Sequence, residues 1–345
     1  MTLPNTKNRN HLIDLLRFVS ACWVVLFHFN EPVKYIDNWY RNFCKLGYLG
    51  VPVFFIISGF CIRIAQKHVK TPNEFIIKRL FRIFPPYWMS LAIVITCAMI
   101  IKVITGYNST PLPKNISGIA ATLFLYTEPV SHFATVNWVY WTLPYELSFY
   151  FIIGLSIFAS KRFVLVLPLV LTSIAILLPI QKENFLFFFN ELPSFLLGYS
   201  LCILIHKDEN KWLNALLFLL SVAGLILKHL SFEYLLTCFL TVTLIYINSK
   251  KTLKENTFSR MGDFSYSIYL LHVPLGIYLL GFIKNKIFVQ QSIIINMVVD
   301  LSLLAGIVFV SKLTFQKIEA PSIELGKKFS KYSLFQLKSL YRKSL

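Results

Sequence analysis

Residues 12–29 read LIDLLRFVSACWVVLFHF, an apolar stretch long enough to cross a membrane as a helix. It nevertheless carries three ionisable side chains: Asp14, Arg17 and His28. Arg17 and His28 are eleven positions apart. On a helix they return to nearly the same face, about 16 Å apart along the axis. Ionisable residues inside a membrane helix usually face the protein interior and mark functional sites. The plainer alternative is an interfacial Asp14–Arg17 ion pair, with His28 as a helix-end residue.

The composition of the chain is that of a membrane protein. Of 345 residues, 56% are hydrophobic and 14% are charged, against about 25% charged residues in soluble domains. Apolar runs of about 20 residues predict about ten membrane helices, and therefore an all-α, polytopic helical bundle forming one domain over residues 1–345. The expected spans lie near 12–29, 47–63, 84–105, 141–159, 163–180, 186–205, 212–228, 232–248, 265–283 and 291–311.

The distribution of basic residues predicts the orientation. If the N-terminus and alternate connections are cytoplasmic, 25 of the 34 Lys and Arg residues lie on that side, which places both termini in the cytoplasm. The net charge of +18 then reflects topology and contact with anionic membrane lipids, and argues against a nucleic-acid partner. Residues 317–345 are expected to form a basic cytoplasmic tail on the inner leaflet, and residues 116–126 a short apolar helix on the outer side.

Small and basic residues follow in the next two segments. Gly47, Gly50 and Gly59 predict close approach of a neighbouring helix, and Ser58 is either a packing residue or a nucleophile. In KRLFRIFPPYW, residues 78–88, Arg79 and Arg82 are one turn apart on an expected short helix, after which the paired prolines begin the next span. Two adjacent guanidinium groups suit a polyphosphate; the alternative is membrane anchoring through lipid phosphates.

Further polar residues lie in later apolar segments. Glu146 follows an outer aromatic belt that includes Trp141, and in the predicted topology it shares the outer half of the membrane with His28. Such a pair could act as a general base and its orienting carboxylate. His272 is either a hydrogen-bonded core residue or a catalyst, and Asp300 requires a buried partner. The six cysteines show no metal-binding spacing, so no metal is expected.

Five segments in order resemble the membrane acyltransferase-3 family, whose members O-acylate cell-surface polysaccharides and related acceptors. The resemblance covers most of the chain and suggests the stand-alone transmembrane form. The family often has glycine on both sides of the first-helix arginine, where this chain has Leu16 and Phe18. The matching residues are Asp14, Arg17 and His28; GVPVFFIISGF at 50–60; Arg79, Arg82, Pro85 and Tyr87; Trp141, Glu146, Phe149 and Tyr150; and SYSIYLLH at 265–272.

The resemblance implies an enzyme of the cell inner membrane that takes an acyl group, usually acetyl, from cytoplasmic acyl-CoA. The acceptor would be a hydroxyl of a glycan or lipid-linked glycan, such as O-antigen, capsule or exopolysaccharide. His28 would be the catalytic base and Glu146 would hold its tautomer, with an acyl-enzyme or direct transfer both open. The acyl-CoA-binding residues would be Arg17, Arg63, Arg79, Arg82 and Tyr87, supported by Asp14, Ser58, Trp141, Tyr269 and His272.

The main alternative is a transporter or flippase for a lipid-linked glycan. Such a protein also needs many spans, intramembrane charges and outer aromatic residues. Transporters are often built from paired repeats with discontinuous helices, and the sequence shows no such symmetry. An O-acyltransferase is therefore the preferred interpretation.

Overall fold

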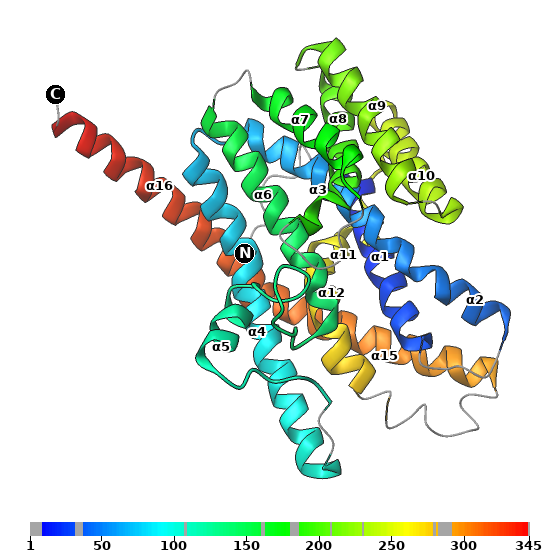
Figure 1. Ribbon diagram of the computed structural model, residues 1–345. Coiled ribbons are helices and arrows are strands. Elements are labelled where there is room, and N and C mark those ends of the chain that lie inside the picture. The colour runs from blue at the N-terminus through cyan, green and yellow to red at the C-terminus, as the bar shows by residue number, and fades with distance from the viewer. Residues whose placement is uncertain are drawn as a thin grey trace.

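The computed structural model describes residues 9–31, 37–106, 109–159, 163–179, 186–207, 209–229, 231–278, 281 and 292–343. These residues form a helical bundle without strands (Figure 1), which confirms the expected all-α class. In chain order the elements are α1 (His11–Asn30), α2 (Trp39–Lys45), η2 (Leu46–Leu49), α3 (Gly50–Lys67), α4 (Pro72–Thr105), α5 (Ile116–Leu123), η3 (Trp138–Trp141), α6 (Thr142–Ala159), α7 (Phe163–Leu177), η4 (Phe187–Phe189), α8 (Leu192–His206), α9 (Lys211–Lys228), α10 (Phe232–Lys250), α11 (Thr257–Met261), η5 (Gly262–Phe264), α12 (Ser265–His272), η6 (Val273–Ile277), α15 (Ile293–Thr314), η7 (Phe315–Glu319) and α16 (Ala320–Lys343).

Seven helical segments of the described chain are long and apolar enough to cross a membrane. They correspond to α1, α2 with α3, α4, η3 with α6, α9, α10, and α15 with α16. Helices α7 and α8 are apolar but shorter. The expected span 265–283 begins as α12 and η6, and its last part lies outside the described residues. The total of ten spans and the cytoplasmic position of both termini remain predictions.

Helices α3 and α8 touch through their backbones because a glycine on each helix faces a backbone carbonyl of the other. A Cβ atom on Gly59 would lie 1.8 Å from the Phe195 carbonyl oxygen, and one on Gly198 would lie 1.8 Å from the Ile56 carbonyl oxygen. Any side chain at either position would therefore force the two helices apart. The close approach predicted at Gly59 is confirmed. The first helix, which lacks flanking glycines around Arg17, is approached instead by Gly262 of η5, where a Cβ would lie 2.2 Å from the Asp14 carbonyl oxygen.

The segment that carries Arg79 and Arg82 differs from the prediction. The structure has one continuous helix, α4, of 34 residues, and Pro85 and Pro86 lie inside it. Internal prolines remove helical hydrogen bonds, but neighbouring helices can compensate in a bundle. The Tyr266 hydroxyl of α12 donates to the carbonyl oxygen of Ile83 at 3.2 Å and ties α12 to α4 close to these prolines. The two arginines are consequently fixed to a long bundle helix.

The last expected span and the basic tail are continuous in the structure. Helices α15 and α16 are joined by η7, a π-helical turn, and form one rod across the molecule (Figure 1). The near part of α16 packs against α4, with the Phe329 ring stacked on Phe81 at 5.4 Å. Its buried face consists of small residues four positions apart, Ser322, Gly326 and Ser330. Such a face permits close helix packing but lacks an apolar stripe.

The partner of Asp300 lies at the C-terminal end of α1. The Asp300 carboxylate accepts hydrogen bonds from Asn30 Nδ2 at 2.8 Å and from the Tyr40 hydroxyl at 2.9 Å. All three side chains are buried. This network ties α1, α2 and α15 together next to His28.

Candidate active site

A cavity of about 120 Å³ lies between α1, α3, α4, α6 and α12. Its charged lining consists of Arg17 from α1, Arg79 and Arg82 from α4, and Glu146 from α6. Polar groups from the other helices complete the wall: Ser58 and Cys61 from α3, and Ser265, Tyr266 and Tyr269 from α12. Three arginines that the sequence placed in one site therefore line a single cavity, together with Glu146, which the sequence paired with His28.

The cavity has an excess of positive charge. In the described part of the chain no ion pair is formed by Arg17, Arg79 or Arg82, although Glu146 acts electrostatically on Arg79 and Arg82. Arg79 packs over the Tyr150 ring at 5.4 Å, and its Nε atom is buried without a hydrogen-bond partner among the described residues. Half-buried guanidinium groups without carboxylate partners form a site suited to an anion.

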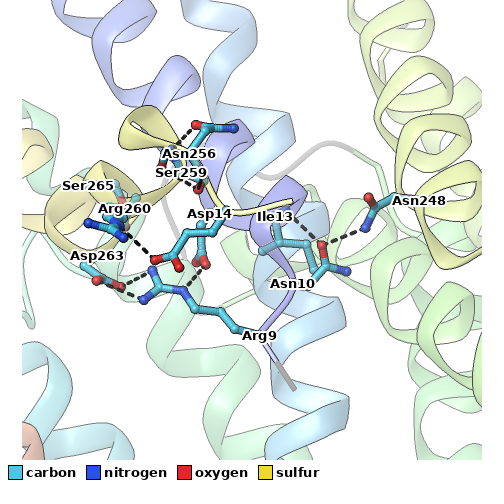
Figure 2. Close-up of polar contacts among 12 residues, drawn as sticks. Arg9, Asn10, Ile13, Asp14, Asn248, Asn256, Ser259, Arg260, Asp263 and Ser265 are labelled. Atoms are coloured by element: carbon cyan, nitrogen blue, oxygen red, sulfur yellow. Dashed lines mark hydrogen bonds and ion pairs between the residues drawn. The ribbon is translucent and has the colours of Figure 1, made fainter. Parts of the chain in front are cut away.

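Asp14 does not neutralise Arg17. Arg9 Nε contacts Asp14 Oδ2 at 2.6 Å, and Arg9 Nη2 contacts Asp263 Oδ1 at 2.6 Å (Figure 2). The alternative of an Asp14–Arg17 ion pair is therefore wrong, because Arg9 occupies the Asp14 carboxylate. Burial raises the pKa of the Asp263 carboxyl, and its hydrogen bond with Arg9 acts in the opposite direction. Arg17 is left to face the cavity.

Two residues expected at the acyl-CoA site lie elsewhere. Arg63 Nη2 forms an ion pair with Glu209 at 2.6 Å, and Arg63 also donates to Gln66 at 2.9 Å. The Tyr87 hydroxyl donates to the Thr122 carbonyl oxygen at 2.6 Å and holds α5 against α4. Neither side chain is among the described residues that line the cavity. Arg63 was grouped with the other arginines because it lies on the same predicted side of the membrane, which does not specify the direction of its side chain. Tyr87 shares α4 with Arg79 and Arg82 but points to another face of that helix.

Glu146 belongs to the arginine cavity and not to His28. Its Oε1 atom accepts a hydrogen bond from Ser58 Oγ at 3.0 Å and another from the Tyr150 hydroxyl. The expected Glu146–His28 hydrogen bond is absent from these contacts. The prediction was wrong because shared depth in the membrane does not specify which helix faces lie opposite each other. Ser58 thus lines the cavity as a donor to Glu146.

His28 lies outside the cavity, beside a second histidine. Its ring stacks on the His272 ring with centroids 5.2 Å apart and contacts Trp138 edge-on at 4.3 Å. The nearest acidic atom is Glu31 Oε2, 3.7 Å from His28 Nδ1. Tyr269 connects the two regions, since it lines the cavity and its ring lies 5.7 Å from His272.

The aromatic residues of η3 surround this connection. The Tyr269 hydroxyl accepts from Thr142 Oγ1 at 2.9 Å and donates to the Val139 carbonyl oxygen. Trp141 packs edge-to-face on Tyr145 at 5.6 Å and is not among the residues that line the cavity. Trp141 therefore packs against the hydrophobic core, while Tyr269 contacts both the cavity and His272.

Sequence reasoning missed Glu319. The π-turn η7 directs this side chain into the bundle, where it is 1% exposed and accepts a hydrogen bond from Ser267 Oγ at 2.8 Å. Its carboxylate acts electrostatically on Arg82 and Arg17. A carboxylate within a basic stretch after the last apolar run gives no periodic signal, because a π-turn changes the helical register.

Comparison with known proteins identifies relatives. The sequence model of the acyltransferase-3 family, described as an acyltransferase domain, matches residues 10–315. The chain is 22% identical over 294 residues to an O-acetyl transferase of Shigella phage Sf6, covering 78% of this chain and 85% of that protein. It is 28% identical over 151 residues to Nodulation protein 10 of Rhizobium leguminosarum bv. viciae, covering 42% of this chain and 37% of the relative. It is 31% identical over 122 residues to the exopolysaccharide production protein ExoZ of Rhizobium meliloti, covering 34% and 36%. No solved structure matches the chain.

Proposed function

The chain belongs to the acyltransferase-3 family, and on that basis we propose that it is a membrane O-acyltransferase for a cell-surface polysaccharide. The donor is a cytoplasmic acyl-CoA, with acetyl as the acyl group, and the acceptor is a sugar hydroxyl. The names of two relatives, an O-acetyl transferase and an exopolysaccharide production protein, support this substrate class. The proposed setting is the cell inner membrane, with about ten spans and both termini in the cytoplasm.

The observation that carries the proposal is the unpaired cluster of Arg17, Arg79 and Arg82 around one cavity. The diphosphate and the ribose phosphate of a coenzyme A thioester provide the negative charges that such a cluster binds. In the predicted topology the cluster lies on the side where basic residues predominate, which the positive-inside rule assigns to the cytoplasm. Lipid phosphates are then bound at the rim and acyl-CoA in the cavity.

The transfer step uses the histidine region at the other end of Tyr269. His28 removes the proton of the acceptor hydroxyl, the oxygen attacks the thioester carbonyl carbon, and the carbon–sulfur bond breaks. The CoA thiolate leaves, and the proton held by His28 is finally released to the thiolate or to water. The Arg17–His28 separation of about 16 Å along α1 is of the order of the pantetheine arm that joins the phosphates to the thioester.

Glu146 has a different role from the one expected. Through Ser58 and Tyr150 it fixes one wall of the cavity, and its charge partly offsets that of Arg79 and Arg82. It acts as a positioning residue on the donor side. A neutral residue at this position would change the affinity for the donor more than the affinity for the acceptor.

The test combines donor binding with acetylation in cells. Purified protein should bind radiolabelled acetyl-CoA, and cells lacking the protein should lose O-acetyl groups from their surface glycan by mass spectrometry. His28→Ala should bind acetyl-CoA normally yet fail to restore acetylation, whereas Arg260→Gln, which alters an exposed ion pair with Glu255, should restore it fully. Full acetylation by His28→Ala would overturn the mechanism. Absence of acetyl-CoA binding by the folded wild type would favour a glycan transporter.

A further inference from the structure

The His28–His272 pair has features that a packing role does not require. Its two rings are nearly parallel, with 14° between their planes, and their centroids are 5.2 Å apart. Ring nitrogens donate and accept hydrogen bonds in the plane of the ring, so two parallel rings do not satisfy each other. His28 Nδ1 and His272 Nε2 are both buried, and neither has a hydrogen-bond partner among the described residues.

The tautomer of His272 is fixed by its neighbour. His272 Nδ1 lies 2.6 Å from the Tyr269 carbonyl oxygen. A carbonyl oxygen only accepts hydrogen bonds, so Nδ1 carries the hydrogen and the neutral ring presents a lone pair at Nε2. His272 is 0% exposed, and a buried acceptor without a donor is destabilising. Buried polar atoms are nearly always paired, and an exception requires a specific explanation.

The surroundings of the pair place it between an exposed aromatic residue and the cavity. Trp138 of η3 contacts His28 edge-on at 4.3 Å and is 44% exposed, so the pair lies directly beneath a surface aromatic residue. Tyr269, which precedes His272 by one turn, lines the donor cavity. The pair therefore lies between the surface and the donor, where an acceptor and a thioester have to meet.

We propose that His272 is a second catalytic residue that binds the acceptor sugar directly through Nε2. While His28 removes the proton of the hydroxyl that becomes acylated, Nε2 of His272 accepts a hydrogen bond from another hydroxyl of the same sugar. The acceptor class is accordingly a ring with at least two free hydroxyls near each other. This inference rests on the proposed function.

Two substitutions separate this role from a structural one. His272→Asn places an amide N–H near the position of Nδ1 and retains the bond to the Tyr269 carbonyl, but it deletes Nε2. His272→Gln places an amide near Nε2 and loses the Nδ1 donor. The probe is an oligosaccharide fraction released from de-O-acetylated surface polysaccharide of the same cells, with radiolabelled acetyl-CoA as donor.

We expect His272→Asn to bind acetyl-CoA like the wild type and to raise the acceptor KM at least tenfold with a smaller effect on kcat, whereas His272→Gln recovers part of the loss. Direct binding of the labelled oligosaccharide, without acetyl-CoA, should weaken to the same extent. Unchanged oligosaccharide binding by His272→Asn would overturn the inference and assign the free nitrogen to water. Equal loss of acetyl-CoA and oligosaccharide binding would also overturn it, as a structural effect. If the wild type binds the oligosaccharide but transfers no acetyl group, the proposed function fails while the binding role of His272 is still measured.

Discussion

Removing the cavity arginines should weaken acyl-CoA binding, whereas removing Arg63 should not. Arg63, Arg79 and Arg82 all lie on the same predicted cytoplasmic side, so charge alone does not distinguish them. In the structure Arg79 and Arg82 face the cavity without ion-pair partners in the described chain, and Arg63 is held by Glu209 at 2.6 Å. The variants Arg79→Ala, Arg82→Ala and Arg63→Ala therefore test the location of the donor site.

The magnitude follows from electrostatics. A phosphate about 4 Å from a guanidinium group interacts with it by roughly 4 kcal/mol at an effective dielectric constant of about 20. Desolvation of the phosphate and relief of the Arg79–Arg82 repulsion on substitution reduce the net loss to roughly 2 kcal/mol, within the range for hydrogen bonds to charged groups. At about 1.4 kcal/mol per tenfold change, each substitution should raise Kd roughly 30-fold.

The assay is equilibrium binding of radiolabelled acetyl-CoA to detergent-purified protein at fixed ionic strength. Folding is checked by thermal unfolding of each variant. Arg63→Ala should lower Tm, because Glu209 loses its partner, but should leave Kd unchanged. The reasoning is refuted if Arg63→Ala weakens binding as much as Arg79→Ala, or if Arg79→Ala and Arg82→Ala both bind with the wild-type Kd.

Three further predictions concern packing and charge. Gly198→Val should destabilise the protein by about 1–3 kcal/mol or more through overpacking and lower Tm, whereas Gly306→Ala, whose Cβ would meet no atom within 4 Å, should not; equal Tm values would contradict the α3–α8 contact. Glu319→Gln keeps an acceptor for Ser267 but removes a negative charge near the arginines. The Kd for acetyl-CoA should therefore fall by roughly threefold, about 0.6 kcal/mol. Weaker binding would contradict an electrostatic effect of Glu319 on the arginines. Asp300→Ala leaves buried donors unpaired and should cost about 2–4 kcal/mol, while Asp300→Asn should cost less, as measured by thermal unfolding; identical losses would exclude the charge as the reason.

Much of the cavity lining was predictable because its residues lie on regular helices. Arg17, Arg79, Arg82 and Glu146 were each identified as ionisable residues inside or beside apolar segments, and buried charge in a membrane protein is a strong signal. The structure brings these four residues to one cavity. The acyl-CoA-binding role of the three arginines and the catalytic role of Glu146 stay predictions.

The wrong predictions concern contacts between residues on different helices. Depth in the membrane suggested that Glu146 meets His28, but rotation of α6 turns it toward Ser58. Helix α16 packs on α4 through small residues, so no hydrophobic stripe in the sequence predicted this contact. Glu319 was hidden by the register change of a π-turn. Single-sequence patterns describe one helix at a time, and pairings between helices depend on rotations that such patterns leave open.

The contact between Gly59 and the Phe195 carbonyl has a consequence for the neighbouring residue. Ser58 is adjacent to Gly59 and faces the cavity from a side of α3 about 100° away from the α8 contact. No side chain lies between the two backbones at this contact. Helix α3 therefore cannot shift toward α8 when a ligand contacts Ser58. That wall of the cavity is therefore rigid, and any widening of the cavity has to come from the other helices that line it, α1, α4, α6 and α12.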